Sequence, residues 1–270
     1  MTRTATTTLR ASRSRPAARR SRAAGRADRP LLERIAPAWL ARYWHATREA
    51  ETVALAIAPL VLVYGVGLAH ASEHARAGVD LVSGQLLRVL PATGYLALQI
   101  AIAGGLVLFA AVRSRATASF RERLVVSGPL VGEAIVYGLT LGGAILWLFD
   151  RLAALAIAPS PVLDRTVAAA GAGLYEELLF RLLLITVLVV LVRRAFDLPR
   201  YAVIGGAVVL SSLVFAAAHH LAGEPFALFP FAYRTVAGAL FAGLFLSRGF
   251  AVAAWSHAAY DFYTLTLLAG

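Results

Sequence analysis

Apolar residues are gathered into long runs along most of this chain, and short polar stretches separate them. An α-helix needs about 20 apolar residues to cross the hydrocarbon core of a bilayer. The pattern therefore predicts an all-α, polytopic membrane protein with about seven transmembrane helices. The predicted helices cover residues 52–69, 95–112, 129–149, 166–192, 201–221, 230–247 and 249–268.

One further segment, residues 78–92, is shorter and more polar than these seven runs. We expect it to lie at the interface or to re-enter the membrane, and an eighth helix results only if it spans. The polar stretch 113–123 is expected to be a loop. Pro129 is then expected near a helix end, where its missing N–H does least harm.

Composition agrees with a membrane protein, because the mean hydropathy is +0.71 and 59% of the residues are hydrophobic. The chain contains no cysteine, which excludes disulfides and all cysteine-based metal or nucleophile chemistry. All 26 basic residues are arginine. We interpret this as a compositional bias and not as a sign of a nucleic-acid partner.

Residues 1–50 hold 12 of the arginines and only three acidic residues. Together with many Ala, Ser and Thr, this predicts a disordered tail that can lie against anionic lipid. A transit peptide has the same composition and is the alternative interpretation. Within residues 31–48, Trp39, Tyr43 and Trp44 favour an interfacial helix that leads into the membrane.

Arginine counts in the loops predict the orientation of the chain. With the N-terminus in the cytoplasm, eight loop arginines, Arg248 among them, lie on the cytoplasmic side and five on the opposite side. The N-terminus is therefore predicted to be cytoplasmic, and with seven helices the C-terminus lies on the other side.

Three charges interrupt the fourth predicted helix: Glu176, Glu177 and Arg181. Each would cost about 2.5 to 3.5 kcal/mol at the centre of a membrane helix if it were unpaired. Glu177 and Arg181 lie one helical turn apart in the favourable order for an ion pair. Glu176 then points about 100° away from Glu177, toward other helices, where a desolvated carboxylate is able to act as a base.

Two histidine motifs follow within later apolar runs. The first is Phe215-Ala-Ala-Ala-His219, followed by His220, and the second is His257-Ala-Ala-Tyr-Asp261. In this order, with Glu-Glu-x-x-x-Arg before them, the motifs resemble those of the type II CAAX prenyl endopeptidases and their bacterial relatives, the CPBP (Abi) intramembrane glutamic proteases. The resemblance covers roughly residues 125–270.

The resemblance implies an intramembrane endopeptidase without a cofactor or metal, with its active site inside the helical bundle. Its partners would be membrane lipid and a peptide or lipidated protein substrate, and its location a bacterial inner membrane. Three parts of the chain are then expected: an Arg-rich tail with an interfacial segment (1–50), N-terminal transmembrane helices (51–124) and a catalytic core (125–270).

The resemblance also implies roles for single residues. Glu176 and His219 would activate a water molecule, and Arg181 would hold the carboxylates in place through Glu177. His257 would bind the oxyanion together with the residue four places on. Many relatives have asparagine there and this chain has Asp261. An ionised carboxylate repels an oxyanion, so Asp261 either carries a proton or orients the His257 ring.

Two alternatives remain open. In a non-enzymatic membrane protein, such as a bacteriocin-immunity factor or a transporter subunit, the same charges would form a structural network. In a zinc metalloprotease, His70, Glu73 and His74 would be the ligands, because they fit the inverted zincin pattern H-x-x-E-H. The zinc site is disfavoured, since this segment lies at the expected water interface and no third ligand is evident. The isolated acid Glu133 is expected either to form an interhelical hydrogen bond or to act near the site.

Overall fold

The computed structural model describes residues 37–72, 75, 80, 82–117, 119–148, 160–221 and 225–267. The chain divides into two units, Met1–Tyr43 and Trp44–Gly270, and the second is a bundle of helices. All regular structure within the described residues is helical, which confirms the predicted all-α class.

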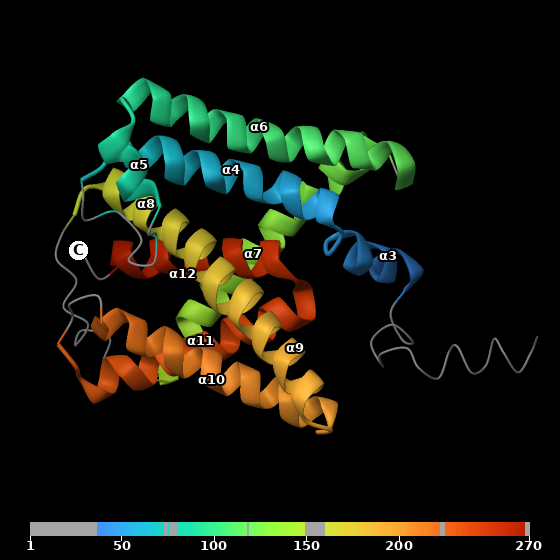
Figure 1. The fold of residues 1–270 in the computed structure, drawn as a ribbon, viewed down its shortest axis with the longest axis vertical. Helices are drawn as coiled ribbons and strands as arrows, with labels where there is room; N and C mark the ends of the chain where they lie inside the picture. The colour runs from blue at the N-terminus through green and yellow to red at the C-terminus, as the bar shows by residue number, and fades with distance from the viewer. Residues whose placement is uncertain are drawn as a thin grey trace, which may run out of the picture. The chain divides into compact units, whose positions relative to one another are not determined.

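The order of the helices follows the predicted apolar runs closely (Figure 1). Helix α3 (Ala38–Ala46) lies in the segment predicted to be interfacial. The others are α4 (Ala50–Leu68), α5 (Ser83–Val89), α6 (Ala92–Thr117), α7 (Phe120–Leu148), α8 (Val162–Gly171), η3 (Ala172–Ile185), α9 (Thr186–Ala195), α10 (Arg200–Leu221), α11 (Leu228–Arg248) and α12 (Phe250–Leu267).

Five of the described helices are long and apolar enough to cross a membrane, so the chain is an integral membrane protein. These segments are residues 50–68, 92–114, 120–145, 200–220 and 228–248. The other two predicted runs are also helical, but they carry the charged and histidine motifs. Residues 166–192 are divided among α8, η3 and α9, and residues 249–268 contain α12. The total of seven spans therefore stays a prediction.

Helix α5 occupies the segment that we expected not to cross the membrane, and it has only seven residues. Its start is held by Asp80, whose carboxylate accepts hydrogen bonds from the backbone N–H groups of Val82 and Ser83. The hydroxyl of Tyr64 in α4 donates to the same carboxylate at 2.6 Å. A helix of this length is too short to span a bilayer.

The joint between two helices does fall within residues 113–123, but it is much shorter than the expected loop, and the expected position of Pro129 near a helix end was wrong. Helix α6 continues to Thr117 and α7 begins at Phe120, which places Pro129 well inside α7. A capping box sets this start, because Ser119 and Glu122 each bond the other's backbone N–H through their side chains.

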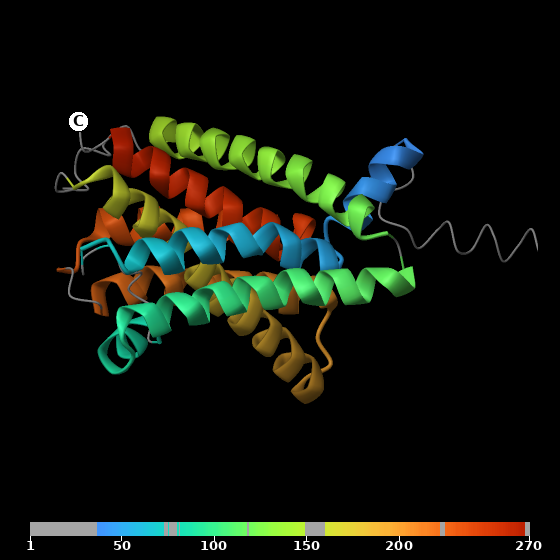
Figure 2. The same ribbon diagram turned by 90° about the horizontal axis from the view of Figure 1, so that it is seen from above.

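Helix α12 packs against five neighbours: α4, α7, α8, η3 and α11. Figures 1 and 2 show it among these helices, while α4 and α6 run side by side. Glycines allow two of the close approaches. A Cβ added to Gly138 in α7 or to Gly173 in η3 would lie 2.4 Å from a carbonyl oxygen of α12. Substitution at either glycine would therefore push its helix away from α12.

Candidate active site

The charged motif lies on η3, which is π-helical over Ala172–Ile185. Such stretches have a wider turn than an α-helix and occur frequently at functional sites. Because the turn is wider, adjacent side chains diverge less in direction. Glu176 and Glu177 are both buried and both lie beside His257 of α12, so Glu176 is directed toward another helix as expected but shares that neighbour with Glu177.

Glu177 joins two helices through a single oxygen atom. Its Oε1 lies 3.1 Å from Nη1 of Arg181, one turn along η3, and 2.7 Å from Nδ1 of His257. All three side chains are almost completely buried. The carboxylate thus fixes both the guanidinium and the orientation of the imidazole ring.

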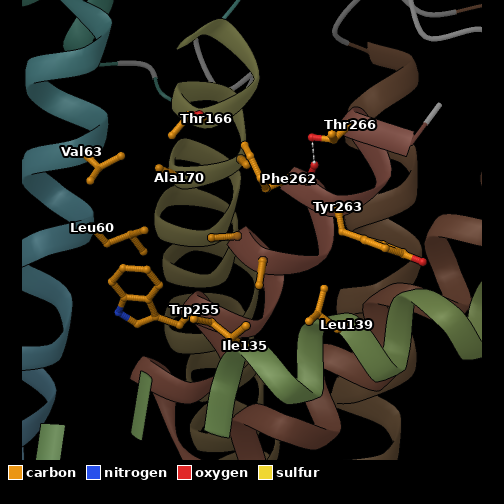
Figure 3. A pocket seen from close by; sticks show the side chains of 13 residues that line it. Leu60, Val63, Ile135, Leu139, Thr166, Ala170, Trp255, Phe262, Tyr263 and Thr266 are labelled. Carbon is orange, nitrogen blue, oxygen red and sulfur yellow. Dashed lines mark hydrogen bonds between the residues drawn. The ribbon is translucent and has the colours of Figure 1, made fainter. Parts of the chain in front are cut away.

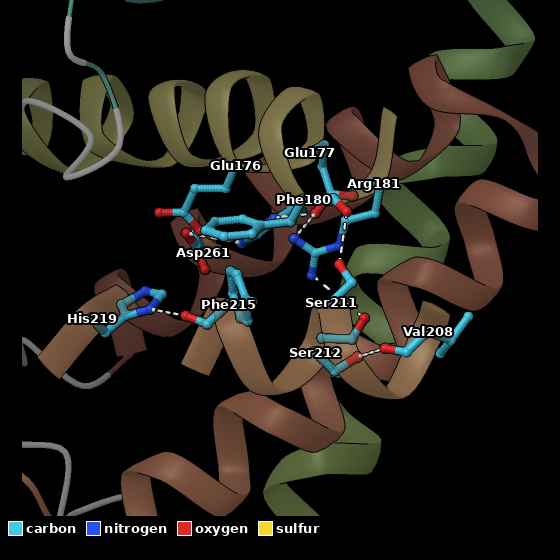
Figure 4. Close-up of polar contacts among 12 residues, drawn as sticks. Glu176, Glu177, Phe180, Arg181, Val208, Ser211, Ser212, Phe215, His219 and Asp261 are labelled. Carbon is cyan, nitrogen blue, oxygen red and sulfur yellow. Dashed lines mark hydrogen bonds and ion pairs between the residues drawn. The ribbon is translucent and has the colours of Figure 1, made fainter. Parts of the chain in front are cut away.

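The other nitrogen of His257 faces two carboxylates (Figure 4 shows Glu176 and Asp261 at this end of the cluster). Its Nε2 is 3.8 Å from Oε2 of Glu176 and 3.6 Å from Oδ2 of Asp261. Both distances exceed hydrogen-bond range. The orienting hydrogen bond that we considered for Asp261 is therefore formed by Glu177 on the opposite edge of the ring.

Aromatic rings enclose the charged groups. Phe241 of α11 stacks on the His257 ring with centroids 4.4 Å apart and planes 14° apart. Phe215 of α10 lies 4.4 Å from the Arg181 guanidinium carbon, within cation–π range. These contacts exclude water from one side of the cluster. Asp261 alone among the three carboxylates has an appreciably exposed side chain, at 25%.

His219, at the end of α10, lies in Figure 4 at the end of the cluster where Glu176 and Asp261 lie. Its Nδ1 is 3.0 Å from the carbonyl oxygen of Phe215. A carbonyl only accepts, so Nδ1 carries a proton and the neutral ring keeps Nε2 as an acceptor. His220 turns elsewhere, because its Nδ1 is 3.2 Å from the carbonyl oxygen of Pro225.

Packing contacts hold the helices of the site together. The hydroxyl of Ser211 in α10 donates to the carbonyl of Phe180 in η3 at 2.7 Å. A Cβ on Gly238 would come within 3.2 Å of Ser212 and Phe215, so glycine allows α10 and α11 to approach each other. These contacts hold α10, which carries His219, against η3 and α11.

Glu133 does not join this cluster, although it was a candidate for a role near the site. It forms two hydrogen bonds of 2.6 Å with the guanidinium of Arg248, at the end of α11. Arg248 also donates to Thr47 at 3.2 Å and lies over the Trp44 ring at 4.0 Å. We call this second group, made of Glu133, Arg248, Thr47 and Trp44, the Glu133–Arg248 clamp.

The alternative zinc motif falls partly outside the described residues, since Glu73 and His74 are not among them. His70 is exposed, and its Nδ1 is 3.0 Å from the carbonyl oxygen of Val66, one turn earlier. The described part of the chain contains no group of three or more potential ligands able to hold a metal ion.

Sequence reasoning missed three features of the site: the second contact of Glu177, the stacking ring of Phe241 and the Ser211 hydrogen bond. Each joins residues on different helices, at separations of 80, 16 and 31 positions along the chain. No spacing rule within one helix predicts such contacts. The polar residue Ser211 within an apolar run was the one available signal.

Comparison with known families gives one result for this chain. Residues 158–263 match the family model described as type II CAAX prenyl endopeptidase Rce1-like. The matched segment contains all three motifs and confirms the family resemblance seen in the sequence. Neither the curated proteins nor the solved structures gave a match.

Proposed function

We propose that this chain, whose residues 158–263 are similar to the type II CAAX prenyl endopeptidase Rce1-like family, is an intramembrane endopeptidase of the glutamic type. The observation that carries the proposal is the convergence of Glu176, Glu177 and Asp261 on His257, where Glu177 is the carboxylate that pairs with a guanidinium among the described residues. Ionisable side chains within membrane bundles are rare and mark functional sites by default, which supports a chemical role for the remaining two carboxylates.

The reaction begins at Glu176, which takes a proton from a water molecule held between its carboxylate and His219. General-base catalysis by a positioned carboxylate contributes roughly 10²- to 10⁴-fold in rate. The hydroxide oxygen forms a bond to the carbonyl carbon of the substrate, and the carbonyl electron pair moves to its oxygen. Glu176 is the suitable base because no described residue forms a direct hydrogen bond with its carboxylate.

His257 stabilises the oxyanion from Nε2. To donate there while Nδ1 donates to Glu177, the ring must carry both protons. The Glu177 contact and two further carboxylates within 4 Å supply the negative charge beside such an imidazolium. The tetrahedral intermediate then collapses, the C–N bond breaks, and the leaving amine takes the proton held by Glu176.

Arg181 and Asp261 act indirectly. Arg181 holds Glu177 at 3.1 Å and thereby the orientation of His257. Many relatives have asparagine at the position of Asp261. Here its carboxylate adds a negative charge beside Nε2 of His257, and it does not orient the imidazole ring. In this arrangement His257 is the main oxyanion donor and Asp261 sustains its charge.

The substrate we propose is a membrane-bound peptide with a lipidated cysteine near its C-terminus, by analogy with the activity in the family's description. A site buried among membrane helices favours a substrate that partitions into the bilayer. The products are a shortened lipidated chain and a free C-terminal peptide.

The test uses the full chain in liposomes with a farnesylated-cysteine peptide that carries three further residues, and with the same peptide lacking the farnesyl group. Mass spectrometry of the products, with and without a zinc chelator, separates the alternatives. Cleavage after the lipidated cysteine that resists the chelator is expected. Loss of cleavage with the chelator would favour the zinc site, and no cleavage of either peptide, with the protein folded, would contradict the proposed substrate.

Cleavage of both peptides at equal rates would keep the endopeptidase and reject the requirement for a lipid. A folded protein that binds these peptides and releases them intact would instead favour the non-enzymatic alternative. Glu176→Gln serves as the matched control in every arm, because it preserves the shape of the side chain and removes the base.

A further inference from the structure

A second feature of the bundle is a pocket of about 460 Å³ between α4, α7, α8 and α12 (Figure 3). Its floor is formed by small residues, among them Ala169, Ala170 and Ala259. Its rim includes Val63, Ile135 and Leu139, whose exposed fractions are 40%, 39% and 43%. The pocket is therefore a hollow that opens between membrane-spanning segments.

The pocket lies on the face of α12 opposite to the candidate active site. Ala259 follows His257 by two positions, which turns it about 200° around an α-helix. Phe262 and Thr266 share the face of Ala259 and also line the pocket. The body of α12 thus separates the pocket from the Glu176 and Glu177 carboxylates, and the pocket is no part of the site described above.

Three of the four wall side chains that carry a polar atom donate hydrogen bonds within the bundle, and the fourth is Tyr263. The hydroxyl of Thr166 donates to the carbonyl of Val162 at 2.8 Å, and that of Thr266 to the carbonyl of Phe262 at 2.6 Å. The indole N–H of Trp255 donates to the carbonyl of Ala56 at 2.7 Å. An apolar hollow without such partners does not hold water well. Its occupant must therefore be a hydrocarbon.

We propose that this pocket binds an acyl chain of a bilayer lipid. An apolar cavity of ~150 Å³ already admits a benzene ring, so this larger one accepts a chain of several carbons. It is too small for a transmembrane helix, which is about 10 Å wide with its side chains. The lipid attached to a peptide under attack at Glu176 does not fit the position either, because α12 stands between them.

An acyl chain here would pack against Ala258 and Phe262, the residues that flank the His257 and Asp261 face of α12. The bound lipid would thereby support α12 from the side opposite to the site. An unfilled cavity carries a cost that grows with its volume, and the bilayer supplies a chain at all times.

The experiment uses Trp255 as a reporter, since it lines the pocket. Trp39, Trp44 and Trp147 are replaced by phenylalanine in the full chain, which is reconstituted in phosphatidylcholine brominated at mid-chain or left unbrominated. Bromine quenches indole fluorescence on contact. We expect strong quenching of Trp255 by the brominated lipid, and a loss of at least half of it in Val63→Phe, which fills the rim, and in Ala169→Leu, which fills the floor.

Ala101→Leu is the matched control, because Ala101 is exposed on α6 and does not line the pocket. It should leave the quenching of Trp255 unchanged. Equal quenching of Trp255 in all four proteins would mean that the quenching comes from lipid around the bundle and not from a chain in the pocket. That result would overturn the proposal. Absent quenching would overturn it in favour of an empty pocket. Quenching that changes with protein density in the bilayer would overturn it in favour of a second copy of the chain.

Discussion

The two polar clusters inside the bundle differ in how their charges are satisfied. In the Glu133–Arg248 clamp, one carboxylate meets one guanidinium through two hydrogen bonds of 2.6 Å. In the candidate active site, three carboxylates surround one imidazole, and Glu176 comes no closer to it than 3.8 Å. The first cluster is closed, whereas the second leaves carboxylate oxygens available.

This difference separates a structural role from a chemical one more clearly than burial does. A desolvated ion pair offsets its own cost only with good geometry and complete hydrogen bonding, and the clamp meets both conditions. Carboxylates that form no direct ion pair or hydrogen bond are rare inside a membrane protein, and those that are retained there mark functional sites. The clamp joins α7 to the end of α11, and α12, which carries His257 and Asp261, follows directly in the chain.

The largest expected effect is on catalysis at the open cluster. Glu176→Gln and His219→Ala should each lower the cleavage rate by roughly 10²- to 10⁴-fold, since each removes part of the water-activating pair. The double variant should be little worse than either single one, because members of a catalytic unit are not additive. Steady-state cleavage in liposomes measures all three. Independent losses that multiply in the double variant would argue against a shared water.

Arg181→Ala should act on both stability and activity. It leaves Glu177 as a buried charge without its guanidinium, a change that typically costs about 3 to 5 kcal/mol. It also releases the carboxylate that orients His257. Thermal unfolding in a lipid mimetic measures the first effect. An unchanged melting temperature would refute the pairing.

At the clamp, Glu133→Gln should lower stability by roughly 1 to 3 kcal/mol, since the Arg248 guanidinium loses its counter-charge. The loss is smaller than for Arg181 because the Glu133 side chain is 21% exposed and water replaces part of the contact. Cleavage per folded molecule should stay within about twofold of wild type. A collapse of the rate in a protein with wild-type stability would place the clamp in the chemistry.

Asp261→Asn should have the smallest effect. Asparagine keeps an acceptor beside Nε2 of His257 and matches the residue of many relatives, so we expect activity within a few-fold of wild type. Asp261→Leu removes both the charge and the acceptor and should reduce activity further. Cleavage rates measured between pH 5 and pH 9 in wild type and Asp261→Asn test the role. A fall in wild-type activity as the pH rises through the pKa of Asp261, absent from Asp261→Asn, would mean that a protonated Asp261 donates to the oxyanion.

Sequence patterns predicted several features that are set within one helix. Apolar run length predicted the all-α class, and i,i+4 spacing predicted that Glu177 and Arg181 would meet. Contacts between helices could not be predicted from these patterns. Arg248 was interpreted as a loop charge, yet it is buried against Glu133, 115 positions earlier. Glu177 also bonds His257, 80 positions later, and it does so from η3, a π-helical segment where we assumed an α-helix.

The start of α7 shows a different kind of error. The signal was present, because Ser119 and Glu122 have the spacing of a capping box. We gave more weight to the charges of residues 113–123 and to Pro129, which suggested a loop and a helix end. Arginine-rich turns of a membrane helix continue readily into the interface, so charge alone does not end it.

One pair of isosteric variants decides whether the open cluster performs hydrolysis while the closed one holds the helices. Glu176→Gln and Glu133→Gln are prepared in the same liposomes, and each is measured for cleavage rate per folded molecule and for melting temperature. We expect Glu176→Gln to lose cleavage and keep its melting temperature, and Glu133→Gln to keep cleavage and melt at a lower temperature. Two variants that lose stability together and retain cleavage would contradict this division of roles.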